Sequence, residues 1–302
     1  EHMVVEADEF DKAFLSLTPT IAVVTTLEKE HMECYDGMDD LRDSFIKFLN
    51  SVPFYGASIL CLDENSLQEL IPRLKRRVIT YGLSTQSDIR ATKISFDNNK
   101  ANFTIEAHGH TLGEINVNLI GLHNVRNSLA AVAVGLELGI DFEGISKAIN
   151  SFAGVYRRFQ IIGEKKGILV IDDFAHHPTE IRATLEGAKM GYDRRLVTVF
   201  QPHLFSRTQA FSDDFGKAFL NSDTLIITSI YPAREKPIEG VTGEIIAHAA
   251  RDFGHRDVLY IPERDDIPQK LLEITKPGDM VLVLGAGTVN QVAYDFYNLL
   301  GE

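Results

Sequence analysis

Residues 168–180 read ILVIDDFAHHPTE, and this stretch decides the fold of the second half of the chain. It begins with four apolar, mostly β-branched residues, a run typical of a strand buried in a parallel sheet. Two carboxylates and two histidines follow, and Pro178 then opens a helix, because proline suits the first helical turn. Ligands of open α/β sheets bind beyond the carboxyl ends of the strands. The stretch therefore predicts a strand-and-helix unit with a candidate site at the strand end.

The same alternation repeats through the rest of the C-terminal half. Each predicted strand is separated from the next by a helical segment, a pattern typical of a doubly wound α/β sheet. The strands are expected at Ile168–Ile171, Leu196–Phe200, Thr224–Ile230, Val258–Tyr260 and Met280–Leu284. We therefore expect a Rossmann-like domain over residues 155–302, beginning just after Gly154.

The N-terminal half predicts a first α/β domain, residues 1–154, with a mixed, mainly parallel sheet. Two apolar runs, Val4–Glu6 and Ile21–Thr26, are expected to be strands buried on both faces. Between Ile89 and Leu119 short hairpin-like runs predict a small antiparallel extension. The remaining predicted elements are a strand at Ala57–Leu62 and helices at Met38–Val52, Ser66–Leu74, His123–Leu138 and Phe142–Phe152.

The composition limits the classes of partner. The chain has 302 residues, of which 44% are hydrophobic, and a net charge of −13, so broad attraction to nucleic acid is not expected. No apolar stretch approaches the roughly 20 residues needed to span a bilayer, so we expect no membrane span. With only Cys34 and Cys61 and no signal-peptide pattern, we expect a reduced, cytoplasmic protein. The sequence makes no prediction of oligomeric state.

Two polar clusters follow the predicted strands of the first domain. Residues 6–11, EADEFD, place four carboxylates in six positions, and residues 28–32, EKEHM, bring a histidine to the same sheet edge. Mg²⁺ prefers oxygen ligands and is often shared with phosphate oxygens, so the pattern favours a Mg²⁺ site beside a nucleotide. The alternatives are a solvated acidic loop and a histidine with a purely structural role.

A helix start at residues 121–131, GLHNVRNSLAA, carries two asparagines on one face. Because an amide offers a donor and an acceptor together, Asn124 and Asn127 are candidates for recognising an adenine edge. The alternative is that Asn124 caps the helix, a common role of asparagine.

Two further segments place arginines near strand ends. Residues 156–160, YRRFQ, lie at the domain junction, where a guanidinium could bind a phosphate, although a surface salt bridge is the commoner role. In residues 200–208, FQPHLFSRT, Arg207 near a helix start could bind a carboxylate, while Ser206 could simply cap that helix. A glycine turn at 285–288, GAGT, is not a dinucleotide fingerprint, and the phosphate-binding pattern G-x-x-x-x-G-K-[ST] does not occur in the sequence.

These motifs occur in an order and spacing that resemble the Mur ligase family over essentially the whole chain. The pairing of YRRFQ with DDFAHHPTEI, and the later stretch IYPAREKPIEGVTG, most resemble the branch that adds L-alanine to UDP-N-acetylmuramate. The resemblance implies an ATP- and Mg²⁺-dependent ligase of peptidoglycan precursor synthesis, working through an acyl phosphate. It also implies that the family's phosphate loop lies just upstream of residue 1 and its UDP-binding domain before that, so the isolated chain is expected to be inactive.

The resemblance also implies roles for individual residues. They fall into a metal site, an ATP site and an amino-acid site, with Arg158 and His176 expected to be catalytic. The metal ligands would be Glu6 and His31; the ATP site would contain His123, Asn124, Asn127, Arg158 and Asp172; the alanine site would contain His176, His203 and Arg207.

The sequence departs from the family pattern at a few positions and leaves alternatives open. Leu204 stands where many relatives carry a second arginine, Phe174 where tyrosine is common, and Glu28 and Glu30 where aspartates are usual. One alternative is the ligase that joins a murein tripeptide to UDP-N-acetylmuramate, which shares the nucleotide motifs. Others are a dinucleotide-binding oxidoreductase, which the missing G-x-G-x-x-G disfavours, and a nucleotide-binding module without catalysis.

Overall fold

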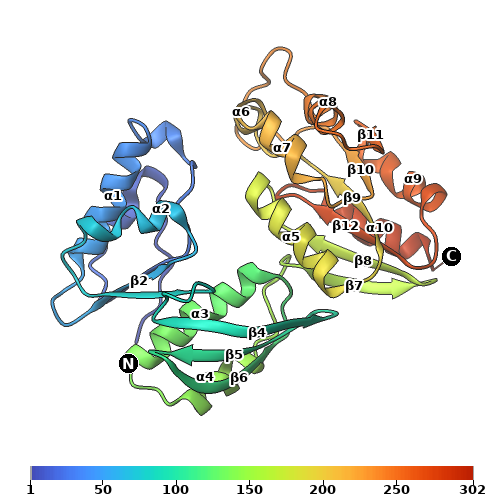
Figure 1. Ribbon diagram of the computed structural model, residues 1–302. Helices are drawn as coiled ribbons and strands as arrows, with labels where there is room; N and C mark the ends of the chain where they lie inside the picture. The colour runs from blue at the N-terminus through green and yellow to red at the C-terminus, as the bar shows by residue number, and fades with distance from the viewer. Residues whose placement is uncertain (1, 302) are drawn as a thin grey trace. The chain divides into compact units, whose positions relative to one another are not determined.

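The computed structural model describes residues 2–301, which form two compact units, each containing most of one six-stranded sheet (Figure 1). The first unit comprises residues 2–95, 101–117 and 123–152, and the second comprises 96–100, 118–122 and 153–301. No helix within 2–301 combines the length and apolar character needed to cross a membrane.

The sheet of the first unit has the strand order β1-β2-β3-β4-β5-β6. Strands β1 to β4 pair in parallel, whereas β5 and β6 pair antiparallel, which confirms the predicted mixed sheet. The turns at Asn98 and His108 take left-handed backbone conformations, as tight hairpins require. The strands are β1 (Ile21–Val24), β2 (Ala57–Cys61), β3 (Val78–Gly82), β4 (Ile89–Asp97), β5 (Lys100–Ala107) and β6 (His110–Val117).

Helices in this unit follow the predicted apolar periodicity. Leu41, Phe48 and Leu49 of the first long helix are buried on one face. The α-helices are α1 (Met38–Ser51), α2 (Asn65–Gln68), α3 (Leu122–Glu137) and α4 (Phe142–Asn150), and the 3-10 helices are η1 (Phe10–Ser16), η2 (Met32–Cys34) and η3 (Ile71–Arg73).

Three predictions for the first unit were wrong. Val4–Glu6 forms no strand, so β1 is the edge of the described sheet, and Val4 is 97% exposed. Strand β1 is not buried on both faces: Val23 is exposed while Ala22 and Val24 are buried. The helix expected at 66–74 is only the short α2 followed by η3, in which Pro72 interrupts the hydrogen-bond pattern.

The second unit is a doubly wound sheet, as predicted, with the order β11-β10-β9-β12-β8-β7. Helices α5, α7 and α8 cover one face and α9 and α10 cover the other (Figure 1). The strands are β7 (Gln160–Lys165), β8 (Ile168–Asp173), β9 (Arg195–Phe200), β10 (Thr224–Ile227), β11 (Val258–Tyr260) and β12 (Asp279–Leu284). The helices are α5 (Pro178–Gly191), α6 (Phe205–Ala210), α7 (Ser212–Ala218), α8 (Glu244–Asp252), η4 (Arg264–Asp266), α9 (Ile267–Ile274) and α10 (Asn290–Leu299).

Strand β7 was not predicted. It pairs antiparallel with β8 at the sheet edge, and a register shift between Ile161 and Gly163 breaks its alternating pattern. Strand β10 is shorter than expected because the chain leaves the sheet at Thr228, whose hydroxyl donates to the carbonyl of Pro262.

The central parallel strands β8, β12 and β9 bring the loops that follow them to one sheet edge. There Gly285 N donates to Asp173 O, and Gln201 N donates to Leu284 O.

Candidate functional site

A buried ion pair lies at the carboxyl end of β8 in the second unit. Arg157 Nε donates to Asp172 Oδ2 at 3.1 Å, and its Nη2 donates to the carbonyl of Gly285 at 2.5 Å. Asp172 is fully buried, and its Oδ1 has no hydrogen-bond partner among the described residues. Burial raises the pKa of Asp172, while Arg157 opposes this rise. Arg157 therefore neutralises Asp172 and ties the end of β8 to the glycine turn.

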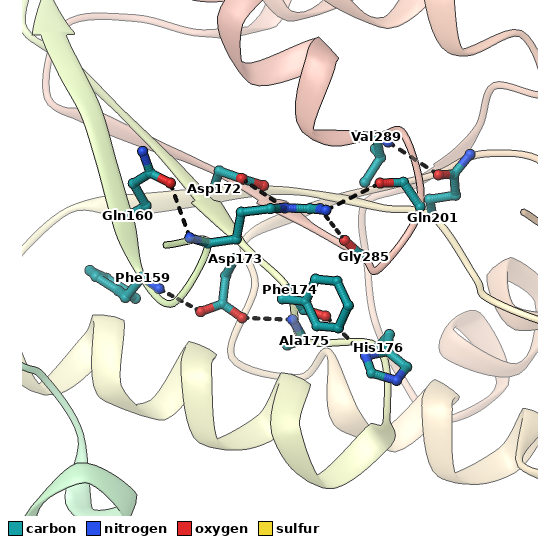
Figure 2. A network of polar contacts seen from close by, with 12 residues as sticks. Phe159, Gln160, Asp172, Asp173, Phe174, Ala175, His176, Gln201, Gly285 and Val289 are labelled. Atoms are coloured by element: carbon teal, nitrogen blue, oxygen red, sulfur yellow. Dashed lines mark hydrogen bonds and ion pairs between the residues drawn. The ribbon is translucent and has the colours of Figure 1, made fainter. Parts of the chain in front are cut away.

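Asp173 holds together the two loops that carry the candidate motifs. Figure 2 shows its carboxylate between Phe159 and Ala175, whose amides donate to it at 2.7 and 2.8 Å. Burial raises the pKa of Asp173 to about 6, although these two amide hydrogen bonds lower it. Phe159 and Arg157 both have positive φ, a conformation that is costly for non-glycine residues and needs such support.

Glu180 brings Arg158 and His176 together. Its carboxylate lies 3.3 Å from His176 Nδ1 and 3.6 Å from Arg158 Nη1, and it accepts the backbone amides of His176 and His177. Although burial raises the pKa of Glu180, the charge of His176 and these amides outweigh it, so the net shift is downward. The structure thus joins two sequence motifs through a residue to which the sequence assigned no role.

His203 lies against His176 and Tyr231. Its ring centroid is 5.7 Å from each of these rings, edge-on to His176 and stacked on Tyr231. Desolvation, together with the neighbouring His176 and Arg207, lowers the pKa of His203 to about 4. His203 is therefore neutral near pH 7, and its buried Nδ1 has no hydrogen-bond partner among residues 2–301.

Short helix α6 carries Arg207 beside His203. The helix begins after Leu204, which has φ +70° and ψ 137°, an unusual backbone conformation for a bulky residue. Leu204 N donates to the carbonyl of Tyr231 at 3.0 Å, and Leu204 O accepts the hydroxyl of Thr208. Ser206 is inside the helix and not its N-cap, so the capping role considered for it is wrong.

In the first unit, three side chains form a group with the geometry of a cation site. Ligand atoms of Glu9, Glu30 and His31 lie within 4.8 Å of one another, and all three residues are partly buried. His31 Nε2 is 3.8 Å from Glu9 Oε1. Two clusters that are separate in the sequence therefore converge. Glu6 is exposed and not one of the three, so its role as a ligand stays a prediction.

The first turn of α3 carries the predicted adenine contacts. Asn124 Nδ2 lies 3.0 Å from His123 Nε2, and Asn127 is exposed. Because α3 begins at Leu122, Asn124 is inside the helix, so the alternative that it caps the helix is wrong. Between the two asparagines, Arg126 Nε donates to Asp63 Oδ2 at 2.9 Å, and Asp63 also accepts the amides of Leu83 and Ser84. This network anchors the helix start to the ends of β2 and β3.

Asp172 and the glycine turn at 285–288 are both enclosed by protein. Asp172 offers no exposed surface to a ribose hydroxyl in this structure, so its role in ATP binding stays a prediction. The glycine turn is filled by protein: a Cβ at Gly287 would lie 2.5 Å from Gln201 Oε1 and 2.6 Å from Tyr231 Cγ. The sequence predicts no role for Arg157, Glu180 or Tyr231, because their contacts join segments that are distant in the sequence.

Comparison with known proteins identifies the family. Residues 1–135 match the Mur ligase middle domain, and residues 157–287 match the Mur ligase glutamate ligase domain. The chain therefore belongs to the Mur ligase family.

Among individual proteins, the chain is similar to two enzymes named UDP-N-acetylmuramate–L-alanine ligase. It is 49% identical to that of Salinibacter ruber and 50% identical to that of Geotalea uraniireducens, with 99% and 97% of the chain aligned. The alignments span 63% and 64% of the relatives, so the chain covers less than two thirds of their length.

Solved structures share the fold. A UDP-N-acetylmuramate–alanine ligase from Thermotoga maritima aligns with 96% of the chain and 61% of its own, at a TM-score of 0.78 and 23% identity. A murein peptide ligase from Psychrobacter arcticus aligns with 96% of the chain and 59% of its own, at a TM-score of 0.66 and 26% identity. These likenesses confirm the predicted α/β architecture.

Proposed function

We propose that this chain forms the nucleotide- and amino-acid-binding parts of a cytoplasmic, ATP-dependent ligase that joins L-alanine to UDP-N-acetylmuramate. The observation that carries the proposal is the identity of about half of all residues, over nearly the whole chain, to ligases of that name. In this reaction the γ-phosphoryl group of ATP passes to the substrate carboxylate. The amine of alanine then attacks the acyl phosphate, an amide forms, and phosphate leaves.

The first unit would hold the divalent cation and the base of ATP. Glu9, Glu30 and His31 offer two carboxylates and an imidazole at ligand spacing, a donor set that fits a divalent ion. Such an ion, when bound, neutralises charge on the phosphoryl oxygens. Asn124, whose amide is held by His123, would face the adenine edge.

The second unit would supply the cation that meets the transferred phosphoryl group. Arg158 is half-exposed, and its ion pair with Glu180 is loose at 3.6 Å, so its guanidinium can turn toward an incoming phosphate. Arg157, in contrast, already donates hydrogen bonds to Asp172 and to the carbonyl of Gly285 in the glycine turn. Arg158 would therefore stabilise the charge of the phosphoryl group, while Arg157 would have a structural role.

His176 is the better candidate to take the proton from the alanine amine. A general base works best when its pKa lies near the working pH, and the carboxylate of Glu180 at 3.3 Å stabilises a protonated His176. His203, with its pKa lowered to about 4, is a weak base and suits a neutral contact to the amino acid. Arg207 would pair with the alanine carboxylate.

The alternatives have less support. A tripeptide ligase shares the fold, but the relatives near 50% identity are named as alanine ligases. A dinucleotide-binding oxidoreductase would need an open glycine turn, whereas Gln201 and Tyr231 fill the space beside Gly287.

The test is an assay of the protein expressed from its native gene, following phosphate release and amide formation with UDP-N-acetylmuramate, ATP and L-alanine. We expect amide formation with alanine but not with a murein tripeptide, and a fall in kcat of roughly 10²–10⁴-fold in H176A but a smaller one in H203A. Preference for the tripeptide, or no ATP-dependent amide formation, would refute the proposal.

A further inference from the structure

The loop after β10 holds the candidate amino-acid site by its backbone. Tyr231 N donates to the carbonyl of Pro202 at 2.8 Å, and Tyr231 O accepts Leu204 N at 3.0 Å. These two hydrogen bonds are made by the residues on either side of His203 in the sequence. The ring of His203 also stacks on the ring of Tyr231. The segment that carries His203 is therefore held by a second segment, residues 230–243 (IYPAREKPIEGVTG). The proposed function gives that second segment no role.

Glu235, from the same loop, binds the first turn of α6. Its carboxylate accepts the amide of Ser206 at 3.0 Å and also the hydroxyl of Ser206. The backbone amide of Phe205 also favours the charged form of this carboxylate. The first amides of a helix need acceptors, and Leu204, at the N-cap position, has no side-chain oxygen to offer. Glu235 therefore caps α6 from a separate segment.

Loss of the Glu235 carboxylate should destabilise the start of α6. Helix α6 has only 6 residues, and it follows the strained backbone of Leu204, so little else fixes where it begins. Although burial raises the pKa of Glu235, its hydrogen bonds from Ser206 and the nearby amide of Phe205 lower it overall, so the carboxylate is charged near pH 7. Arg207 lies in the helix that this charge caps, and the same charge acts on His203.

We propose that Glu235 is a positioning residue for the acceptor amino acid: it caps α6 and so fixes the orientation of Arg207, which lies in that helix. The inference rests on the proposed function, since it takes Arg207 as the contact to the alanine carboxylate. In this role Glu235 acts through α6 and not by direct contact with a substrate.

The test compares the variants E235A and E235Q in the protein expressed from its native gene. We expect E235A to raise the KM for alanine by about ten-fold, with the KM for ATP changed by less than about two-fold, because only the α6 turn loses its acceptor. E235Q keeps an acceptor oxygen and should restore most of the affinity. The matched control is E164A, which removes a carboxylate bound to Arg194 elsewhere in the same unit.

A second measurement separates positioning from general destabilisation. If Glu235 acts through Arg207, E235A should change the KM for alanine by less than about two-fold in an R207A background. Equal effects on both substrates, or a full additional effect in R207A, would overturn the proposal, as would an unchanged KM for alanine in an active E235A enzyme. An inactive wild-type protein would instead overturn the proposed function.

Discussion

The two units use the same types of charged residue in opposite ways. In the first unit Glu9, Glu30 and His31 are partly exposed, and His31 lies 3.8 Å from Glu9, beyond hydrogen-bond distance. In the second unit Asp172 and Asp173 are buried and accept close hydrogen bonds from Arg157 and from backbone amides. Partly exposed carboxylates at ligand spacing can still take a ligand, whereas fully buried ones stabilise the fold. Burial, and not residue type, separates the two roles.

The largest expected effect is on the buried pair. R157A leaves Asp172 buried without its cation, which should lower the free energy of unfolding by about 3–5 kcal/mol. Urea unfolding followed by circular dichroism would measure it. The double variant R157A/D172N should recover part of the loss, because no uncompensated charge remains. A loss below about 1 kcal/mol in R157A would contradict the assignment of this pair to the scaffold.

The next effect concerns cation binding in the first unit. H31A and E9A should each weaken Mn²⁺ binding by about ten-fold or more, since a ligand contributes at least as much as its outer-shell partners. Electron paramagnetic resonance titration would follow free Mn²⁺. The control is E6A, at an exposed position outside the three-residue group. Loss of binding in E6A but not in E9A would favour the ligand implied by family resemblance over the one that the geometry favours.

A pH effect should come from Asp173. Its pKa is about 6 in the folded protein, above the ordinary value of 3.8, so the folded state holds its proton more tightly. The stability it contributes is therefore complete below about pH 4 and is lost as the pH rises through about 6. Unfolding of wild type and D173N between pH 4 and 7 should show this slope in the wild type only.

The pH dependence of stability expected from His203 has the opposite sign to that expected from Asp173. Its pKa is lowered from 6.5 to about 4, so its contribution is present above pH 6.5 and is lost as the pH falls toward 4. H203F should remove that loss of stability at acid pH.

For the Asp173 prediction, a D173N profile that matches the wild type would show that Asp173 is not the group that titrates.

The smallest effect is expected from a cluster residue in the absence of metal. E30Q should change the free energy of unfolding by less than about 0.5 kcal/mol, because glutamine keeps the length of the side chain and an acceptor oxygen at a partly exposed position. The same urea titration, run in chelator, would measure it. A change above about 1 kcal/mol would break the contrast between the two units.

Much of the fold could be predicted because periodicity and turn residues are local signals. The buried strands β8, β9 and β12 are mainly apolar runs, and the hairpin turns at Asn98 and His108 lie within the segment 89–119 predicted to be antiparallel. Two of the errors arose where a partner strand decides the outcome: the edge position of β1 and the antiparallel addition of β7 depend on neighbours that no local pattern describes.

The candidate site divides in the same way. From the sequence alone come the strand ends, the motif residues His31, Asn124, Arg158, His176, His203 and Arg207, and membership of a family. Only the tertiary structure decided that Glu9 and Glu30 join His31, that Glu180 connects Arg158 to His176, and that Arg157 is a buried scaffold residue. The physical reason is that residue type determines which contacts a side chain can make. Burial and distance, which folding alone establishes, determine which contacts it does make.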